Sequence, residues 1–144
     1  MAHPRFQLVP GSRLAASAGN SVVGGGVGWR LLGSNNRELG RSSIAYADAE
    51  AALSAIHRLR TLAATGDAHI VHDPASGHWA WHLDDEGSWI ANSGRGFRHE
   101  RECRYNLEQF RASAPSAPAS EQDHLVDFPW QRSVSLASPS EISP

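Results

Sequence analysis

The second half of the chain repeats the residue pattern of the first half at a constant spacing. Tyr46 and Phe97 are 51 residues apart. The same spacing relates Leu39 with Ile90, Ser42 with Ser93, Ala52 with Cys103, Ile56 with Leu107, Leu59 with Phe110, and Arg60 with Arg111. Trp29 matches Trp81 if one turn differs in length by a single residue. A repeat of this length indicates two copies of one supersecondary unit.

Local patterns predict the same order of elements in both copies. Short, mostly alternating stretches bounded by Gly, Asn, Asp and Pro are typical of strands, and they lie at residues 5–9, 29–32, 38–44, 68–73, 78–83 and 88–93. Asp48 suits the N-cap of a first helix that ends at Gly66, with apolar residues at 3–4 spacing. A second helix is expected from about Glu100. Each copy therefore has the order strand, strand, strand, helix.

Three segments fall outside this pattern. A long loop, Gly11 to Gly28, interrupts the first copy, and residues 112–122 form a Pro/Ala/Ser linker whose composition is too poor in apolar residues to fold. A small apolar stretch follows, in which residues 123–127 could form a strand, and residues 128–144 are expected to be disordered. We predict a single domain, 1–127, made of two repeats at about 5–65 and 66–112.

The composition excludes several classes of protein. The 144 residues are 40% apolar, with a formal net charge of −2 and 13 basic side chains, all Arg. These values fit one globular domain and fit neither a polyanion-binding protein nor an acidic tail. One cysteine cannot form an internal disulfide, no apolar run approaches the roughly 18 residues of a membrane span, and the first residues lack a signal-peptide pattern. We expect a soluble cytoplasmic protein.

The tryptophans of the second copy have two interpretations. Trp79, Trp81 and Leu83 alternate along one strand, so they share a face. This favours a buried sheet face, with a ligand or partner surface as the alternative. Trp89 differs, because it faces solvent if Ile90 faces the core. It is either a contact point, together with Arg95, or it protects a sheet edge or packs under the Gly11–Gly28 loop.

The sequence offers no obvious catalytic, cofactor or metal-binding set. His78 and His82 share a strand face but lie about 13 Å apart at roughly 3.3 Å per residue. His72 lies opposite His78 in one hairpin register, yet a pair of histidines without a further ligand is a poor zinc site. The Gly-rich loop lacks the Lys and Ser/Thr of a phosphate-binding loop. Cys103 lies on the apolar stripe of the second helix and is expected to be buried.

Arginines gather on and before the second helix. Arg101, Arg104 and Arg111 share one side of it with Glu108, which suggests contacts with phosphates. Interleaved glutamates favour a solvated mixed-charge face instead. The candidate contact surface from sequence comprises Trp89, Arg95, Arg101, Arg104 and Arg111.

Residues 70–111 follow a pattern of Gly-x-aromatic-x-aromatic-x-Leu, a Gly-containing turn, Ile-x-x-Ser, an aromatic residue and a helix ending in a basic residue. The matching positions are Gly77, Trp79, Trp81, Leu83, Gly87, Ile90, Ser93, Phe97, Leu107 and Arg111. The first copy matches at Trp29, Leu31, Leu39, Ser42, Tyr46, Ile56 and Arg60. This pattern resembles that of the YegP-like family of small uncharacterised proteins.

The resemblance implies an α+β fold in which a tandem pair of βββα units forms one antiparallel sheet with two helices packed on it. The units would be related by a pseudo-two-fold axis, with the strand after each helix exchanged between them. Pro118 and Ala119 stand where the last exchanged strand should begin, which leaves residues 123–127 for that strand. His99 replaces the usual Ser or Thr N-cap, so a looser helix start is expected. The resemblance carries over no catalytic residue.

These observations predict a non-catalytic interaction or accessory module that is monomeric, with an unidentified protein partner and no membrane or nucleic-acid partner. Two alternatives stay open. One is a nucleic-acid-binding protein that uses the second helix. The other is a ligand carrier or enzyme with a pocket between sheet and helices.

Overall fold

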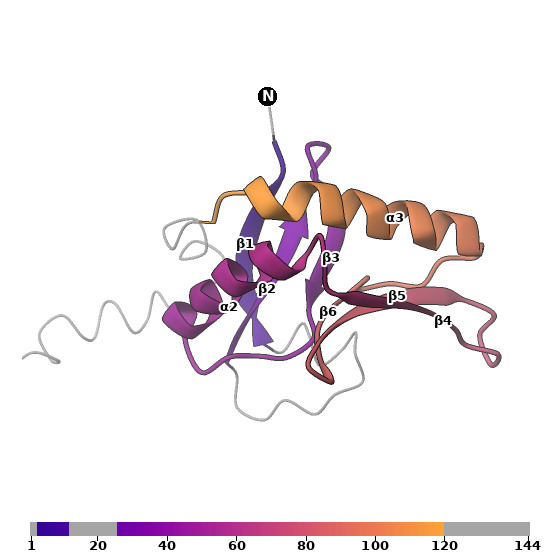
Figure 1. Ribbon diagram of the computed structural model, residues 1–144, viewed down its shortest axis with the longest axis horizontal. Helices are drawn as coiled ribbons and strands as arrows, with labels where there is room; N and C mark the ends of the chain where they lie inside the picture. Colours follow the sequence, from indigo (N-terminus) through magenta and orange to yellow (C-terminus); the bar gives the residue numbers. More distant parts are fainter. Residues whose placement is uncertain (1–2, 12–25, 120–144) are drawn as a thin grey trace, which may run out of the picture.

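A computed structural model describes residues 3–11 and 26–119 (Figure 1). Three strands and a helix are followed by three more strands and a second helix: β1 (Arg5–Pro10), β2 (Val27–Leu32), β3 (Glu38–Ser42), α2 (Ala49–Leu62), β4 (Asp67–His72), β5 (Trp79–Asp85), β6 (Ser88–Asn92), α3 (Glu100–Ser113) and the 3-10 turn η1 (Ala114–Ser116). The predicted elements are therefore present, and the predicted strand at 29–32 begins earlier, at Val27.

All six strands form one antiparallel sheet in the order β1-β2-β3-β6-β5-β4. The strands of the two halves of the chain meet at the centre, where β3 pairs with β6 through Arg41 opposite Asn92 and Ser42 opposite Ala91. The two helices lie on one side of the sheet, α2 over β1 and β2, and α3 over β3, β4 and β5 (Figure 1). The predicted α+β class with one antiparallel sheet and two helices is confirmed.

The core lies between this sheet face and the helices, and an aromatic cluster occupies its centre. Phe110 of α3 lies between Trp29 of β2 and Trp81 of β5, at ring-centroid distances of 6.2 and 4.8 Å. Trp29 and Trp81 are each 1% exposed. The prediction that alternating tryptophans form a packed sheet face is confirmed for these two, while Trp79 is half-buried at the margin of the core.

The apolar stripes of both helices are buried as predicted, and their first turns differ. The Asp48 carboxylate accepts a hydrogen bond from the backbone N–H of Ala51 at 2.8 Å, which satisfies a donor at the start of α2. At the start of α3, His99 makes no side-chain capping bond. The buried stripe residues are Ala52, Ile56 and Leu59 in α2 and Cys103, Asn106, Leu107 and Phe110 in α3.

The segment after α3 differs from the prediction of an unpacked linker at residues 112–122. Helix α3 extends to Ser113, and Ala114 and Ala117 are buried. The Pro118 carbonyl accepts a hydrogen bond from the N–H of Phe6 at 2.8 Å, and Ala119 forms a parallel bridge with Phe6 in β1. Small alanine side chains pack where the composition predicted no burial. The possible strand at 123–127, the tail at 128–144 and most of the Gly11–Gly28 loop lie outside the described residues.

Candidate functional site

One polar residue from every strand contributes to a row across the sheet face opposite the helices. The register places Gln7 opposite Arg30, Arg30 opposite Arg41, Arg41 opposite Asn92, Asn92 opposite His82, and His82 opposite His69. Residues directly opposite in an antiparallel sheet project to the same face. Their neighbours along the strands, such as Trp29 and Trp81, face the core. Alternation therefore places this polar row on the face that no described helix covers.

Hydrogen bonds and ion pairs hold the part of the polar row that belongs to the first half. Arg30 Nε donates to Gln7 Oε1 at 2.7 Å, and Arg41 Nη2 donates to Glu38 Oε1 at 2.9 Å. Glu38 also lies 3.9 Å from Arg30 Nη1. The two guanidinium groups share this carboxylate, which offsets one of their two positive charges.

A stack of three rings marks the other half of the row. The His82 ring lies between Trp89, at a centroid distance of 3.8 Å, and His69, at 5.0 Å. Both His Nε2 atoms approach the Asp84 carboxylate: His69 at 3.2 Å from Oδ2, and His82 at 3.6 Å from Oδ1. Burial lowers the pKa of His82, Asp84 opposes this shift, and His69 adds a smaller lowering.

A pocket of about 450 Å³ lies beside these rings on the uncovered face. Its lining includes apolar surface from Val71, Ala80 and Trp89, and polar groups from His82, Asn92 and Arg95. Trp89 is 53% exposed and Val71 is 45% exposed. The prediction that Trp89 faces solvent is confirmed. This pocket lies on the side of the sheet away from the helices. A second pocket, of about 620 Å³, lies where the carrier or enzyme alternative placed one, between Leu39 of β3 and Tyr105 and Asn106 of α3.

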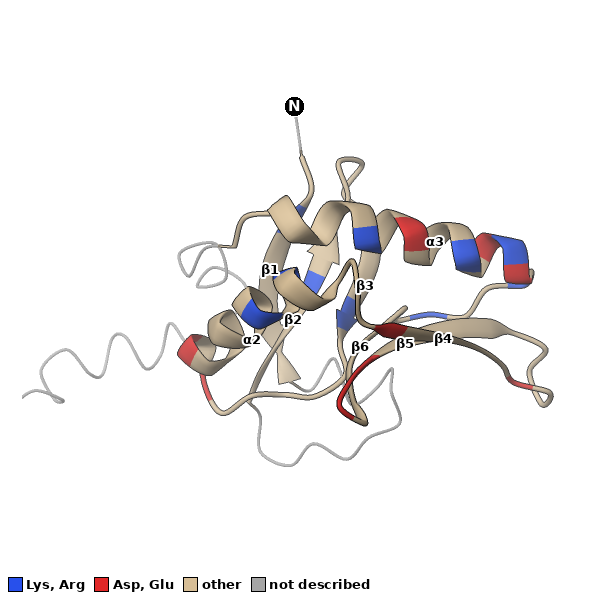
Figure 2. Ribbon diagram, in the orientation of Figure 1, with Lys and Arg blue, Asp and Glu red and all other residues tan. Residues whose placement is uncertain are grey.

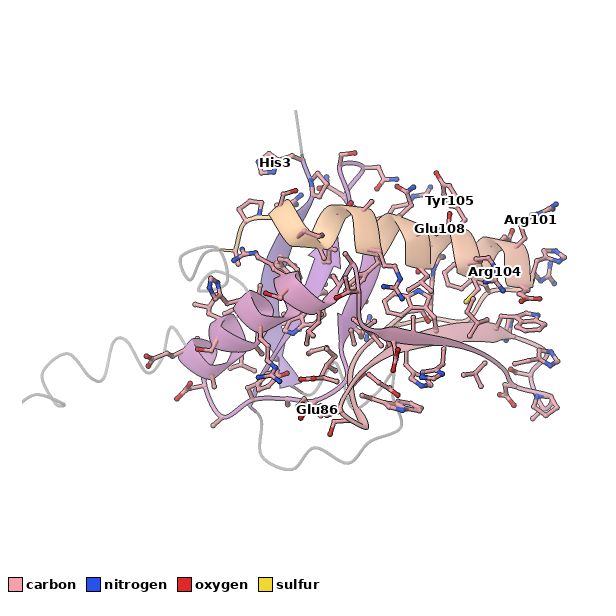
Figure 3. The ribbon with its side chains drawn as sticks, viewed as in Figure 1. His3, Glu86, Arg101, Arg104, Tyr105 and Glu108 are labelled. Carbon is pink, nitrogen blue, oxygen red and sulfur yellow. The ribbon has the colours of Figure 1, made fainter. Side chains whose placement is uncertain are left out.

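The structure does not bring the five candidate contact residues into one surface. Trp89 and Arg95 line the pocket on the uncovered face, and the Arg95 guanidinium lies 4.5 Å from the centroid of the Phe97 ring. Arg101 and Arg104 lie on α3, near its first turn (Figure 3), and neither of them lines that pocket.

Arg111, the fifth candidate, binds the protein's own backbone. Its Nη1 donates to the carbonyl of Ala63 at 2.9 Å and its Nη2 to the carbonyl of Gly66 at 3.0 Å, just after α2. Its repeat counterpart Arg60 donates from Nη2 to the Ala117 carbonyl at 2.8 Å, after α3. Arg111 thus satisfies carbonyls just after the other helix, which favours a structural role for it over a contact role.

Acidic and basic residues alternate along the length of α3 (Figure 2). Arg104 donates to Glu100 at 2.7 Å, one turn earlier in the helix. Such a surface has no extended positive potential, and this favours the mixed-charge interpretation of the arginines.

The histidine pair considered from the sequence differs from the pair in the structure. His72 lies opposite Trp79, and their rings are 4.5 Å apart, so it is not opposite His78. His69 and His82 are opposite each other instead, and Asp84 joins them. The signal in the sequence was the His-x-Asp spacing of His82 and Asp84, which places both side chains on one strand face.

Cys103 is fully buried in the α3 stripe, as predicted, and burial raises its pKa to about 11 against a smaller lowering by Arg104. Ellman's reagent at pH 8 should therefore leave the native thiol unmodified and react completely in denaturant.

The raised pKa of Cys103 also makes stability depend on pH. Because the unfolded thiol ionises at about pH 8.5, the thiol's contribution to stability is full below that pH and is lost as the pH rises through the folded pKa. Between about pH 8.5 and the folded pKa, the free energy of unfolding should fall less in Cys103→Ala than in the wild type. For the Ellman's experiment, a native thiol that reacts as fast as the denatured thiol would contradict the burial of Cys103.

No helix among the described residues is long and apolar enough to cross a membrane. No protein-family model matches the chain, and no curated protein matches it.

Two solution NMR structures share the fold. The protein of unknown function YegP from E. coli aligns with a TM-score of 0.64 and 12% identity, over 83% of this chain and 93% of YegP. A UPF0339 protein from Shewanella oneidensis aligns with a TM-score of 0.63 and 10% identity, over 81% of this chain and 89% of that one. The predicted likeness to the YegP-like family is confirmed at the level of an α+β fold with one antiparallel sheet and two helices, and both neighbours are proteins whose function is not known.

Proposed function

We propose that this chain, which has the YegP fold, is a monomeric, non-catalytic interaction module of the cytoplasm. It binds a protein partner on the uncovered sheet face, at the pocket beside Trp89. The observation that carries the proposal is the placement of Trp89. This large side chain is 53% exposed, held against His82 on one side and next to a pocket on the other.

Trp89 has the properties of an interface anchor. Tryptophan is enriched among the residues that dominate binding energy in protein interfaces. The stacking of Trp89 on His82 restricts the indole before any partner arrives, so less side-chain entropy is lost on binding. Val71 and Ala80 offer apolar lining for one inserted side chain, and Asn92 and Arg95 offer polar groups at the rim. This arrangement fits an apolar centre with a polar rim.

We also propose that the chain is built as a tandem pair of βββα units that are related by a pseudo-two-fold axis. Isolated bridges join matched positions in both halves, Val27 with Tyr46 and Trp79 with Phe97. The matched arginines Arg60 and Arg111 each bind the backbone that follows the other half's helix. Together with the 51-residue spacing of Tyr46 and Phe97, these pairs support two equivalent units.

The state of the nucleophilic side chains supports a role without catalysis. The Cys103 thiol is buried and protonated at neutral pH, so it lacks the thiolate that nucleophilic attack requires. Ser42 Oγ accepts a hydrogen bond from the N–H of Trp29 at 3.1 Å, and Ser93 Oγ donates to the carbonyl of Arg95 at 2.7 Å. Both hydroxyls bond to backbone.

A nucleic-acid role is the weaker alternative. Arg111 is engaged with backbone carbonyls and Arg104 with Glu100. Phosphate contacts dominate nucleic-acid affinity, and two of the three arginines of α3 are already engaged within the protein.

Substitution of Trp89 tests the proposed interface. Proteins captured from nuclease-treated native lysate by the wild type should be lost with Trp89→Ala and retained with Tyr105→Ala. Tyr105 is the matched control, because it is 64% exposed and projects from the outer side of α3 (Figure 3). With the purified partner, Trp89→Ala should raise Kd by at least about 30-fold, as for an anchor worth 2 kcal/mol or more. A partner held equally by Trp89→Ala would overturn the proposal.

A further inference from the structure

Two imidazoles and one carboxylate converge at the β4–β5 hairpin. One potential ligand atom from each of His69, His82 and Asp84 lies within 4.8 Å of the others. Both His Nε2 atoms face the same carboxylate, at 3.2 Å and 3.6 Å from its two oxygens. We propose that these three side chains form a site for a divalent transition-metal ion, with Zn²⁺ as the best-suited ion.

The sheet itself fixes the positions of the three side chains. His69 and His82 are direct cross-strand partners, and Asp84 follows His82 two residues later on the same face. The pairing of β5 with β6 shifts its register between Leu83 and Asp84, whereas the pairing of β4 with β5, which places His69 opposite His82, has no such shift. The His82 ring is held between Trp89 and His69. Two of the ligands therefore come from one rigid strand, and metal sites built on strands are held more closely than sites on loops.

Asp84 carries an atom whose environment is incomplete without a cation. Its Oδ1 is buried and accepts no hydrogen bond in the described part of the chain. Buried polar atoms almost always have a partner, and an ionised one without compensation is costly. A metal ion between this oxygen and the two Nε2 atoms would supply the missing partner.

The donor set selects the class of ion. Two imidazole nitrogens and one carboxylate oxygen suit Zn²⁺ and its neighbours in the first transition row, whereas Mg²⁺ and Ca²⁺ prefer oxygen ligands. Metal–nitrogen bonds of about 2.0–2.1 Å would bring tetrahedral ligands to about 3.3 Å from each other. His69, with a side chain 52% exposed, has room to rotate into this position. Three protein ligands leave the remaining coordination position open to solvent.

This site goes beyond the proposed interaction function, because its ligands do not depend on Trp89 binding a partner. It also differs from the histidine pair suggested by sequence spacing, which included neither His69 nor Asp84.

Calorimetric titration of the untagged full chain with Zn²⁺, and visible absorption with Co²⁺, test the site. We expect one ion per chain, Co²⁺ bands typical of four-coordinate nitrogen and oxygen ligation, and Zn²⁺-induced shifts of the imidazole resonances of His69 and His82. His69→Ala and Asp84→Asn should each raise the Zn²⁺ Kd by at least about tenfold, since even residues that only support ligands cost 10–100-fold.

His72→Ala is the matched control, because His72 lies on the same strand with its ring against Trp79. It should bind Zn²⁺ as the wild type does. Thermal unfolding of each variant in the absence of metal shows whether the variant still folds. It therefore distinguishes a variant that has lost a ligand from one that has lost its fold. Wild-type affinity in both His69→Ala and Asp84→Asn, or the absence of stoichiometric binding by the folded wild type, would overturn the site. Neither result bears on partner capture through Trp89.

Discussion

Phe110→Ala is expected to lower the free energy of unfolding by about 3–5 kcal/mol, the cost of deleting a buried phenylalanine ring. Phe110 is fully buried, and its ring contacts Trp29 from the first half of the chain and Trp81 from the second. Its removal leaves a cavity that rigid neighbours on two strands cannot close. Urea unfolding followed by circular dichroism measures the effect. Tyr105→Ala, at an exposed position of the same helix, should change stability by less than about 0.5 kcal/mol.

Gly40 gives a second test of the same contact. A Cβ at Gly40 would lie 2.7 Å from Phe110 Cδ1 and 2.9 Å from the Trp81 ring, closer than real Cβ contacts allow. Gly40→Ala should therefore destabilise the wild type by overpacking and cost much less when Phe110 is already Ala. Strictly additive effects, or a loss below about 1.5 kcal/mol for Phe110→Ala, would show that the ring is not the packing centre.

Patterns that report burial predicted most of the fold. Alternation identified the buried face of β5 and the exposed position of Trp89, and the 3–4 spacing identified both helix stripes, because each depends only on the geometry of one element. Composition was a poorer guide at 112–122. Ala114 and Ala117 are buried there. Arg60 binds the Ala117 carbonyl and Phe6 of β1 binds the Pro118 carbonyl, and neither contact is visible in a Pro/Ala/Ser sequence.

The cluster of His69, His82 and Asp84 was missed in the sequence because it depends on the register between two strands. Comparing His78 with His82 considered one strand alone, whereas the hairpin turn decides which residue of the neighbouring strand lies opposite. The Asp73 N–H bonds to the His78 carbonyl at 2.9 Å, and this closure places His69 opposite His82. For Arg111, the signal in the sequence was its 51-residue spacing from Arg60. An arginine at matching positions of the two proposed units suggests a structural role, and both arginines donate to backbone carbonyls.

Residues 66–127 expressed alone should either form a homodimer or remain unfolded, whereas the full chain should be monomeric. In the full chain, β6 pairs with β3, so the isolated second half exposes that strand edge. It also loses the packing of Phe110 against Trp29, and Arg111 loses the Ala63 carbonyl. A fragment of about 60 residues is already near the lower limit for independent folding.

A homodimer would repair these losses if the proposed pseudo-two-fold axis becomes a true two-fold axis. The β6 strands of two fragments would then pair where β3 and β6 pair in the full chain, and each Phe110 would contact the other copy. Sedimentation equilibrium, read together with circular dichroism, distinguishes the states. As a control, Phe110→Ala in the fragment should weaken the dimer, because it removes the side chain that crosses the axis. A folded, cooperative monomer of residues 66–127 would mean that the halves are independent domains, and the shared core between Trp29 and Phe110 would then be dispensable for folding of the second half.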